Sequence, residues 1–451
     1  MSEPPVTMPP WEQLEALVDQ QDAARLRACI DTLSSGELAR ALSRLDQEHQ
    51  SAVLTMLPPE VAAVVLDALH HSQAADMIEE LSAGQAAAII DELPSDEQAD
   101  VLGELDEEDA EAILEQLDPE EREEIRRLTT YGPDTAGGLM ITEYLAYSEH
   151  MRVDQVVQDL RAQAREYASY DVQYVYVVSG EQEQLRGVVR LQNLMLAPDS
   201  APMSSLMKPV NSVEIVADLD QLKEFFDRHN FYGAPVVDER GQLVGVVRRA
   251  DVEEALDERA DKTLMRFGGI IGGEELRMMP LSSRSLRRLA YLFPTLLLAL
   301  MAVSIIAVFE STVERVPAVA IFLPLVAGLC GSSGNQALAV SIRELSLGLA
   351  QPADWVRVFM KEIGLGLIMG LALGVAVFGV AWLMRRNTSL ALAVGGAIPI
   401  TIMVAVTIGG ITPLLLRGLK IDPAMASGPI VTTVVDLTGF FIVLVGTALL
   451  I

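Results

Sequence analysis

Cysteines and recognisable catalytic motifs are scarce in this sequence. Its only cysteines, Cys29 and Cys330, lie in different regions, which excludes a disulfide framework and a cysteine-based metal site. The sequence also contains no phosphate-binding loop, no zinc-ligand spacing and no nucleophile paired with a base, so an enzyme is the least favoured class. Residues 1–5 have neither a basic nor an apolar run, and we expect no export signal ahead of the first domain.

Positive charge is scarce in the first 280 residues. The chain of 451 residues has 63 acidic and 33 basic side chains, and only 7 and 11 of these lie from Leu281 onward. The leading part therefore carries 56 acids against 22 bases, a net charge of −34. Such a surplus repels nucleic acid and anionic lipid and favours cations, among which Mg²⁺ and Ca²⁺ are the usual oxygen-bound ions. Solubility alone is the alternative explanation for most of these acids.

Evenly spaced leucines mark the first part of the chain. They recur every twelve residues, at Leu57, Leu69, Leu81, Leu93, Leu105 and Leu117. Each is followed by Pro, Ser or Asp, and in most cases then by acids, which is typical of a helix start. This spacing predicts an all-α superhelical domain over residues 1–135, of the kind that presents a surface.

Two copies of one unit follow, about 58 residues apart. Each copy is predicted to contain a helix, a strand, a tight turn, a second strand and another helix. The predicted strands cover residues 175–178 and 187–190 in the first copy, and 234–238 and 245–248 in the second.

This α/β pattern resembles a tandem pair of CBS domains over residues 136–255. In CBS pairs that bind nucleotides, a hydroxyl and a carboxylate follow the second strand of the hairpin. Here the hydroxyl position holds Arg190 or Arg248, whereas Asp251 is present at the carboxylate position. The resemblance therefore leaves ATP open as a ligand, with Asp251 as its candidate contact.

A connecting region is predicted over residues 256–285. An acidic helix leads into the pairs Gly268–Gly269 and Gly272–Gly273, which interrupt regular helix and offer hinges. A solvated helix and a cation-binding face explain the acidic run equally well.

Five apolar stretches then predict an α-helical membrane domain over residues 286–451 with five transmembrane helices. They cover residues 289–309, 316–342, 363–384, 390–416 and 423–451. If the soluble part is cytoplasmic, eight flanking Lys or Arg residues lie inside and three outside, as the positive-inside rule expects. An odd number of crossings then places the C-terminus outside.

A lone carboxylate, Asp436, lies within the last apolar stretch. Intramembrane charges are costly and normally face a bundle interior or an ion path. Gly428, Thr432 and Asp436 recur every four residues and therefore share one helix face. A carboxylate bonded to a neighbouring helix, without a transport role, is the alternative.

The second apolar stretch has a polar, glycine-rich segment after Pro324, from residues 328 to 336. We expect loosened backbone there, with free carbonyls that could act as cation ligands. In the third stretch, Gly366, Gly370 and Gly374 predict close helix packing.

These features together resemble the MgtE family of magnesium transporters over essentially the whole chain. The motifs that carry the resemblance are Gly334-Asn335-Gln336 after Pro324, Asp422-Pro423-Ala424, and Asp436-Leu437-Thr438-Gly439. The resemblance implies a homodimer in the bacterial inner membrane that conducts Mg²⁺ into the cytoplasm. It further implies closure when cytoplasmic Mg²⁺ binds between the acidic soluble domains and the connecting helix.

Carried over to this sequence, the resemblance assigns pore residues and gating acids. The pore residues would be Asp436, Thr432, Asn335, Gln336 and Gly428, and Asp436 would bind the ion. The regulatory metal ligands would be Asp96, Asp100, Asp251, Glu254, Asp257 and Asp422. The sequence departs from the usual family pattern at Ser332, Gly428, Arg259 and Lys262.

Two other functions fit parts of the sequence. A Na⁺- or H⁺-coupled divalent cation exchanger could use the same scaffold. A membrane-anchored CBS sensor of ions or nucleotides would need inert spans, which Asp436 and the polar second stretch argue against.

Overall fold

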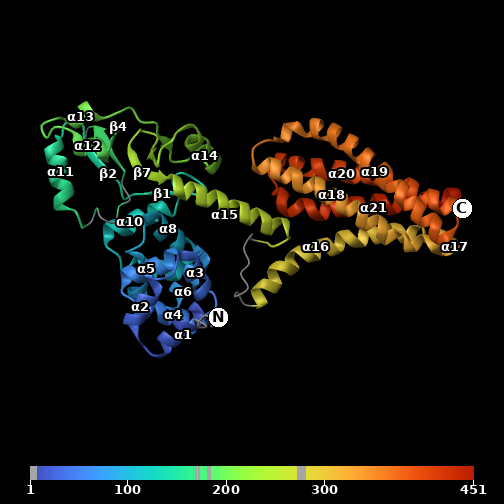
Figure 1. The fold of residues 1–451 in the computed structure, drawn as a ribbon, viewed down its shortest axis with the longest axis horizontal. Helices are drawn as coiled ribbons and strands as arrows, with labels where there is room; N and C mark the ends of the chain where they lie inside the picture. Colours follow the sequence, from blue (N-terminus) through green and yellow to red (C-terminus); the bar gives the residue numbers. More distant parts are fainter. Residues whose placement is uncertain (1–7, 166, 168–169, 171–172, 180–183, 272–280) are drawn as a thin grey trace, which may run out of the picture. The chain divides into compact units, whose positions relative to one another are not determined.

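A computed structural model describes residues 8–165, 167, 170, 173–179, 184–271 and 281–451. The chain forms two compact units, Met1–Asp257 and Glu258–Ile451. Figure 1 shows the helices and strands of both units. The finer division into four domains stays a prediction.

Ten short helices form the first part of the leading unit, each 8 to 10 residues long. They are α1 Pro10–Asp19, α2 Ala23–Ile30, α3 Ser35–Leu42, α4 Gln47–Met56, α5 Pro59–Asp67, α6 His71–Glu79, α7 Ala83–Ile90, α8 Ser95–Glu104, α9 Glu107–Leu114 and α10 Pro119–Leu128. Prolines, serines and aspartates precede most of them, as the sequence predicted.

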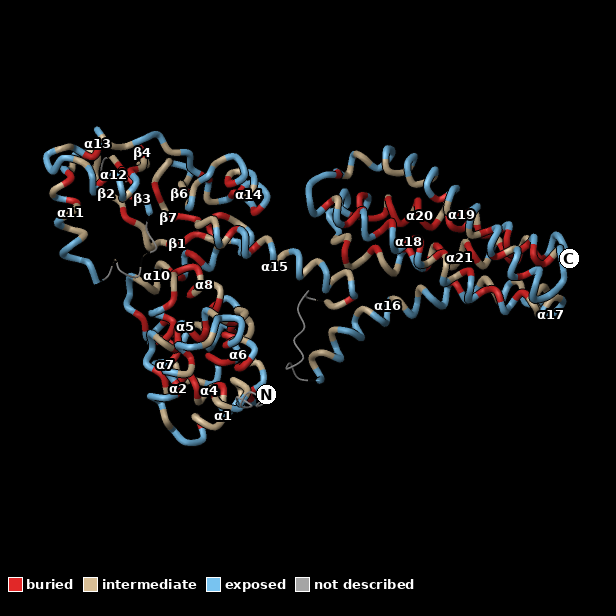
Figure 2. The backbone as a smooth tube through the Cα atoms, viewed as in Figure 1, coloured by how far each residue is buried: buried red, intermediate tan, exposed pale blue. Residues whose placement is uncertain are grey.

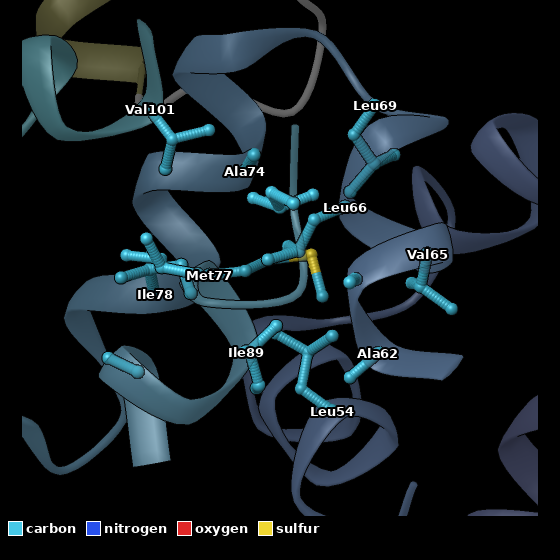
Figure 3. Packing of buried hydrophobic residues seen from close by; sticks show 14 of the residues in the cluster. Leu54, Ala62, Val65, Leu66, Leu69, Ala74, Met77, Ile78, Ile89 and Val101 are labelled. Atoms are coloured by element: carbon cyan, nitrogen blue, oxygen red, sulfur yellow. The ribbon is translucent and has the colours of Figure 1, made fainter. Parts of the chain in front are cut away.

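The repeated leucines pack side by side in one hydrophobic core that these helices share. Leu57, Leu69, Leu93 and Leu105 lie at or just after helix ends and are at most 8% exposed. Figure 3 shows the tight packing of Leu54, Leu66, Met77 and other apolar side chains from successive helices. The same spacing extends back to buried Leu45 and partly buried Leu33, so the leucine repeat is longer than the sequence reading recognised, and the predicted all-α superhelical fold is confirmed.

Two similar α/β repeats complete the leading unit, as the CBS pattern predicted. The first contains β2 Leu145–Ser148, α11 Val153–Ala162, β3 Tyr174–Ser179, β4 Gln184–Arg190 and α12 Leu191–Leu196, followed by α13 Met203–Leu206. The second contains β5 Val213–Glu214, α14 Leu219–Arg228, β6 Gly233–Val237, β7 Leu243–Arg248 and α15 Arg249–Phe267.

The sheets of the two repeats follow one design. In each, a short parallel strand precedes an antiparallel hairpin, which gives the orders β2-β3-β4 and β5-β6-β7. Strand β1, Met140–Ile141, adds to the second sheet beside β7. Both hairpins contain a register shift at the matching place, between Val177 and Val178 and between Val236 and Val237.

Helix α15 carries the acids of the predicted connecting region. It ends at Phe267, and Gly269 has a φ of +83°, a conformation that favours glycine. The predicted hinge at Gly272–Gly273 lies outside the described residues.

Five helical stretches of the second unit are long and apolar enough to cross a membrane, with hydropathies of 1.6 to 2.4. They are α16 Leu281–Val308, η1 Pro317–Ile321 with α18 Leu323–Ser346, η2 Pro352–Asp354 with α19 Trp355–Arg385, α20 Thr388–Gly418, and α21 Pro423–Leu450. A short helix, α17 Glu310–Arg315, follows α16. Figure 2 shows α20 as the most buried of the five and α16 as the most exposed.

The predicted loosening of the second apolar stretch is wrong. Residues 328–336 lie inside the continuous helix α18, and the hydroxyl of Ser333 donates to the carbonyl of Leu329 in its own helix. The glycine at 334 instead permits close packing: a Cβ built there would lie 3.3 Å from the carbonyl oxygen of Ala405. Small residues here serve contact between helices rather than exposure of carbonyl groups.

The glycine seam of α19 packs as the sequence predicted. Gly366, Gly370 and Gly374 are buried, and Cβ atoms built on them would lie 2.6–2.8 Å from backbone atoms of α20. The two backbones therefore approach as closely as glycine allows.

Candidate cation sites

A pocket of about 450 Å³ in the leading unit contains several acidic side chains. It lies where α5 and α8 meet the second CBS repeat and α15. We call helices α1 to α10, Pro10–Leu128, the helical array. The acids that line the pocket are Asp67, Glu97, Glu143, Asp251, Glu253 and Glu254. Two of the six, Asp251 and Glu254, were predicted as regulatory ligands. Asp67 and Glu97 were missed because the neighbours of their helices were not assigned, and Glu143, between β1 and β2, and Glu253, on α15, were not named as ligands.

Arg248 joins two of the predicted ligands, Asp96 and Asp251. Its Nη2 lies 3.2 Å from Oδ2 of Asp96, and its Nε lies 2.6 Å from Oδ2 of Asp251. The other carboxylate oxygen of Asp96 accepts from the backbone N–H of Glu97. The structure thus brings Asp96 and Asp251 together, with an arginine between them.

Burial makes the carboxyl groups of Asp96, Asp251 and Glu254 costly to ionise. It raises the pKa of Asp96, although Arg248 acts in the opposite direction. Burial also raises the pKa of Asp251 and of Glu254, with the Glu97 carboxylate adding to both shifts. Cations placed among these acids would therefore relieve an unfavourable concentration of negative charge.

The remaining predicted ligands do not line the pocket. Asp100 lies 3.7 Å from Nδ1 of His71, whose Nε2 lies 3.2 Å from Oε2 of Glu97, an acid of the pocket. Asp257 is exposed. Asp422 is the N-cap of α21, where it accepts from the N–H of Ala424 and lies 3.2 Å from Nη1 of Arg266. In the described part of the chain, no group of three or more His, Cys, Asp or Glu side chains is arranged to hold a metal ion.

Asp436 lies within the transmembrane stretch of α21, on the same face as Gly428 and Thr432. Thr432 is exposed and the other two are partly exposed, so this face is not closed by the bundle of one chain. Among the described residues, none forms a hydrogen bond or ion pair with the Asp436 carboxylate. The alternative of a carboxylate bonded to a neighbouring helix is therefore not what the structure shows.

Asn335 and Gln336 lie on α18, which packs against α21 through Gly334, Val431 and Val435. Both side chains are exposed. Within the described residues, neither has a hydrogen bond to Asp436, so their assignment to the pore stays a prediction.

A second pocket, of about 170 Å³, lies between the two CBS repeats and has the opposite charge. Arg190 and Lys208 line it together with Tyr174, Tyr176 and Phe231. No acid is among its described lining residues. Asp251, predicted as a nucleotide contact, lines the acidic pocket instead.

Comparison with known proteins identifies the parts of the chain. Residues 323–446 match the MgtE family model, described as a divalent cation transporter. Residues 33–134 match the MgtE intracellular N domain, and residues 203–258 match the CBS domain.

Among solved structures, the soluble part of a magnesium transporter is 26% identical, with a TM-score of 0.50, and the match covers 56% of this chain and 98% of that one. The cytosolic domain of the Mg²⁺ channel MgtE in complex with ATP is 32% identical, with a TM-score of 0.50, over 54% of this chain and 99% of that one.

Magnesium transporters named MgtE from three bacteria are similar over most of the chain. The protein of Thermus thermophilus is 34% identical over 71% of both chains. That of Enterococcus faecalis is 31% identical over 71% of this chain and 70% of its own, and that of Bacillus subtilis is 30% identical over 70% of each. This chain therefore belongs to the MgtE family of magnesium transporters.

Proposed function

We propose that this protein is a homodimeric Mg²⁺ channel of the bacterial inner membrane, with its acidic unit and CBS domains in the cytoplasm. The observation that carries the proposal is the unpaired carboxylate of Asp436 on a partly exposed face of a transmembrane helix. A charge at membrane depth needs water, a cation or a polar partner. A second copy of α21, with a hydrated ion between the two copies, supplies all three.

Ion passage follows from the chemistry of Mg²⁺. This ion gives up its water reluctantly, so two Asp436 carboxylates would hold the hydrated ion through its coordinated waters. The Thr432 hydroxyl, one turn away on the same face, adds a further acceptor. Selectivity would come from the size and field strength of this ring.

Closure by cytoplasmic Mg²⁺ follows from the acidic surplus. Carboxylates crowded on facing surfaces repel one another, and a divalent ion between them removes that repulsion. The exposed acids Glu253 and Glu254 of α15 line the acidic pocket and are suited to this role, because burial and the neighbouring carboxylates of Glu97 and Asp251 already raise the pKa of Glu254.

The test is Mg²⁺ flux into liposomes as a function of Mg²⁺ on the side of the soluble unit. We expect flux to fall as that concentration rises, and to be independent of Na⁺ and pH gradients. A flux that needs either gradient would instead indicate the coupled exchanger. Empty liposomes and liposomes with heat-denatured protein provide the controls.

We also propose that the basic pocket between the CBS repeats binds ATP. Arg190 and Lys208 can neutralise phosphates, and Tyr174 and Phe231 can stack on a base. A relative with 32% identity has been solved in complex with ATP.

Replacing the pocket lysine tests this assignment. We expect Lys208→Met to weaken ATP binding by roughly tenfold, the factor for one lost charge-assisted contact. Isothermal titration of the full-length protein measures it. Arg240→Met, in the exposed hairpin turn outside the pocket, should bind ATP as the parent does, and equal affinity in both variants would contradict the assignment.

A further inference from the structure

The space between two of the predicted metal ligands, Asp96 and Asp251, is filled by a cationic side chain of the protein itself. Arg248 contacts Asp96 of α8 at 3.2 Å and Asp251 of α15 at 2.6 Å. The side chains of Asp96 and Asp251 are only 8% and 14% exposed, and that of Arg248 is 29% exposed. A guanidinium is always charged and matches carboxylates geometrically, so it can take the place that a bound cation would fill.

The position of Arg248 in its repeat makes this arrangement specific to the second copy. Arg190 occupies the matching place after the first hairpin, where it is exposed and lines the basic pocket. Two arginines at equivalent positions therefore have different surroundings. Among the described residues, ion pairs to two carboxylates are seen for Arg248, which faces α8, and not for Arg190.

Further contacts hold α8 against the second repeat without an ion. The carboxylate of Glu143 accepts from the N–H and the hydroxyl of Ser95 at 2.9 and 2.8 Å, and the Ser95 hydroxyl accepts from the N–H of Thr142 at 2.9 Å. Ala99 of α8 and Leu128 of α10 lie in the same apolar cluster as the core of that repeat. Charge, hydrogen bonds and apolar packing thus all favour the docked arrangement.

We propose that Arg248 is a permanent internal cation that keeps the helical array docked on the second CBS repeat in the absence of divalent ions. This inference rests on the proposed gating function, because it concerns which contacts of the soluble unit respond to Mg²⁺. The response to Mg²⁺ then belongs to the acids outside the Asp96–Asp251 pair. Removal of the guanidinium would leave two facing carboxylates and make docking depend on a divalent ion.

Hydrogen exchange of the full-length protein, with EDTA and with saturating Mg²⁺, tests the proposal. In the parent, amides of α8, Ser95–Glu104, should exchange at the same rate in both conditions. In Arg248→Met they should exchange roughly tenfold faster in EDTA, the factor for one lost charge-assisted hydrogen bond, and Mg²⁺ should restore the parental rate. Amides of α4, Gln47–Met56, serve as the internal reference.

Two variants and the parent itself decide the outcome. Arg248→Lys keeps the charge but has one nitrogen in place of the two that contact Asp96 and Asp251, so its exchange in EDTA should fall between those of the parent and Arg248→Met. Arg240→Met removes an exposed arginine and should change nothing. Mg²⁺-dependent exchange of α8 in the parent would overturn the proposal, even if Arg248→Met does not fold. Parental exchange of α8 in Arg248→Met with EDTA would overturn it too. None of these outcomes depends on Mg²⁺ flux, so they are separable from a failure of the proposed channel function.

Discussion

Asp436→Ala should reduce Mg²⁺ uptake by roughly a hundredfold or more, because it removes about 3 kcal/mol of charge-assisted stabilisation of the ion. Asp436 is the only charged residue in α21 and has no bonding partner among the described residues. Its removal therefore breaks no hydrogen bond or ion pair to the part of the chain that the structure describes. Mg²⁺ uptake into liposomes, with the oligomeric state measured alongside, checks this expectation.

The control for this variant is a carboxylate outside the proposed ion path. Asp354 lies at the start of the third span, in η2, and its carboxylate accepts from the N–H of Gln351. Asp354→Asn keeps the shape and should leave uptake near the parental level. Uptake that survives in Asp436→Ala with an intact dimer would remove the pore assignment.

Gly370→Ala should destabilise the membrane unit by about 1–3 kcal/mol, the usual cost of overpacking. A Cβ at this position would lie 2.6 Å from Cα and 2.8 Å from the carbonyl oxygen of Pro399. Neither backbone atom can move away as a flexible side chain could. Thermal unfolding in detergent, followed by size-exclusion chromatography, measures the loss.

Gly379 provides a matched control within the same helix. A Cβ built there has no atom within 4 Å, so Gly379→Ala adds only the higher helix propensity of alanine. We expect its unfolding temperature to equal or exceed that of the parent. Similar unfolding temperatures for the two alanine variants would show that the seam tolerates a wider spacing.

Local periodicity was sufficient to predict much of the fold. The twelve-residue leucine spacing, the paired hairpins and the five apolar stretches all correspond to observed elements. Each of these elements depends on contacts between residues that are close in sequence, and a repeating sequence pattern therefore indicates it directly. The glycines of α18 misled prediction because the same small residues loosen a helix in water and bring helices together in a membrane.

The acidic pocket could be predicted only in part. Asp96 and Asp251 were named as ligands, but their shared partner, Arg248, was noted only as a departure from a nucleotide motif. The contact joins α8 to β7 across 152 residues, and no local pattern encodes such a distance. The arginine in a hydroxyl position was the available signal, and it indicated a changed role without naming the partner.

Tyr291 of α16 lies between two glycines of the membrane unit. A Cβ at Gly269, just beyond α15, would lie 2.5 Å from its ring, and a Cβ at Gly428 would lie 3.4 Å from its hydroxyl. We therefore expect a shift at the end of α15 to displace this ring, and with it the part of α21 two turns before Asp436. A single aromatic side chain thus lies against both the segment that follows α15 and the helix that carries Asp436.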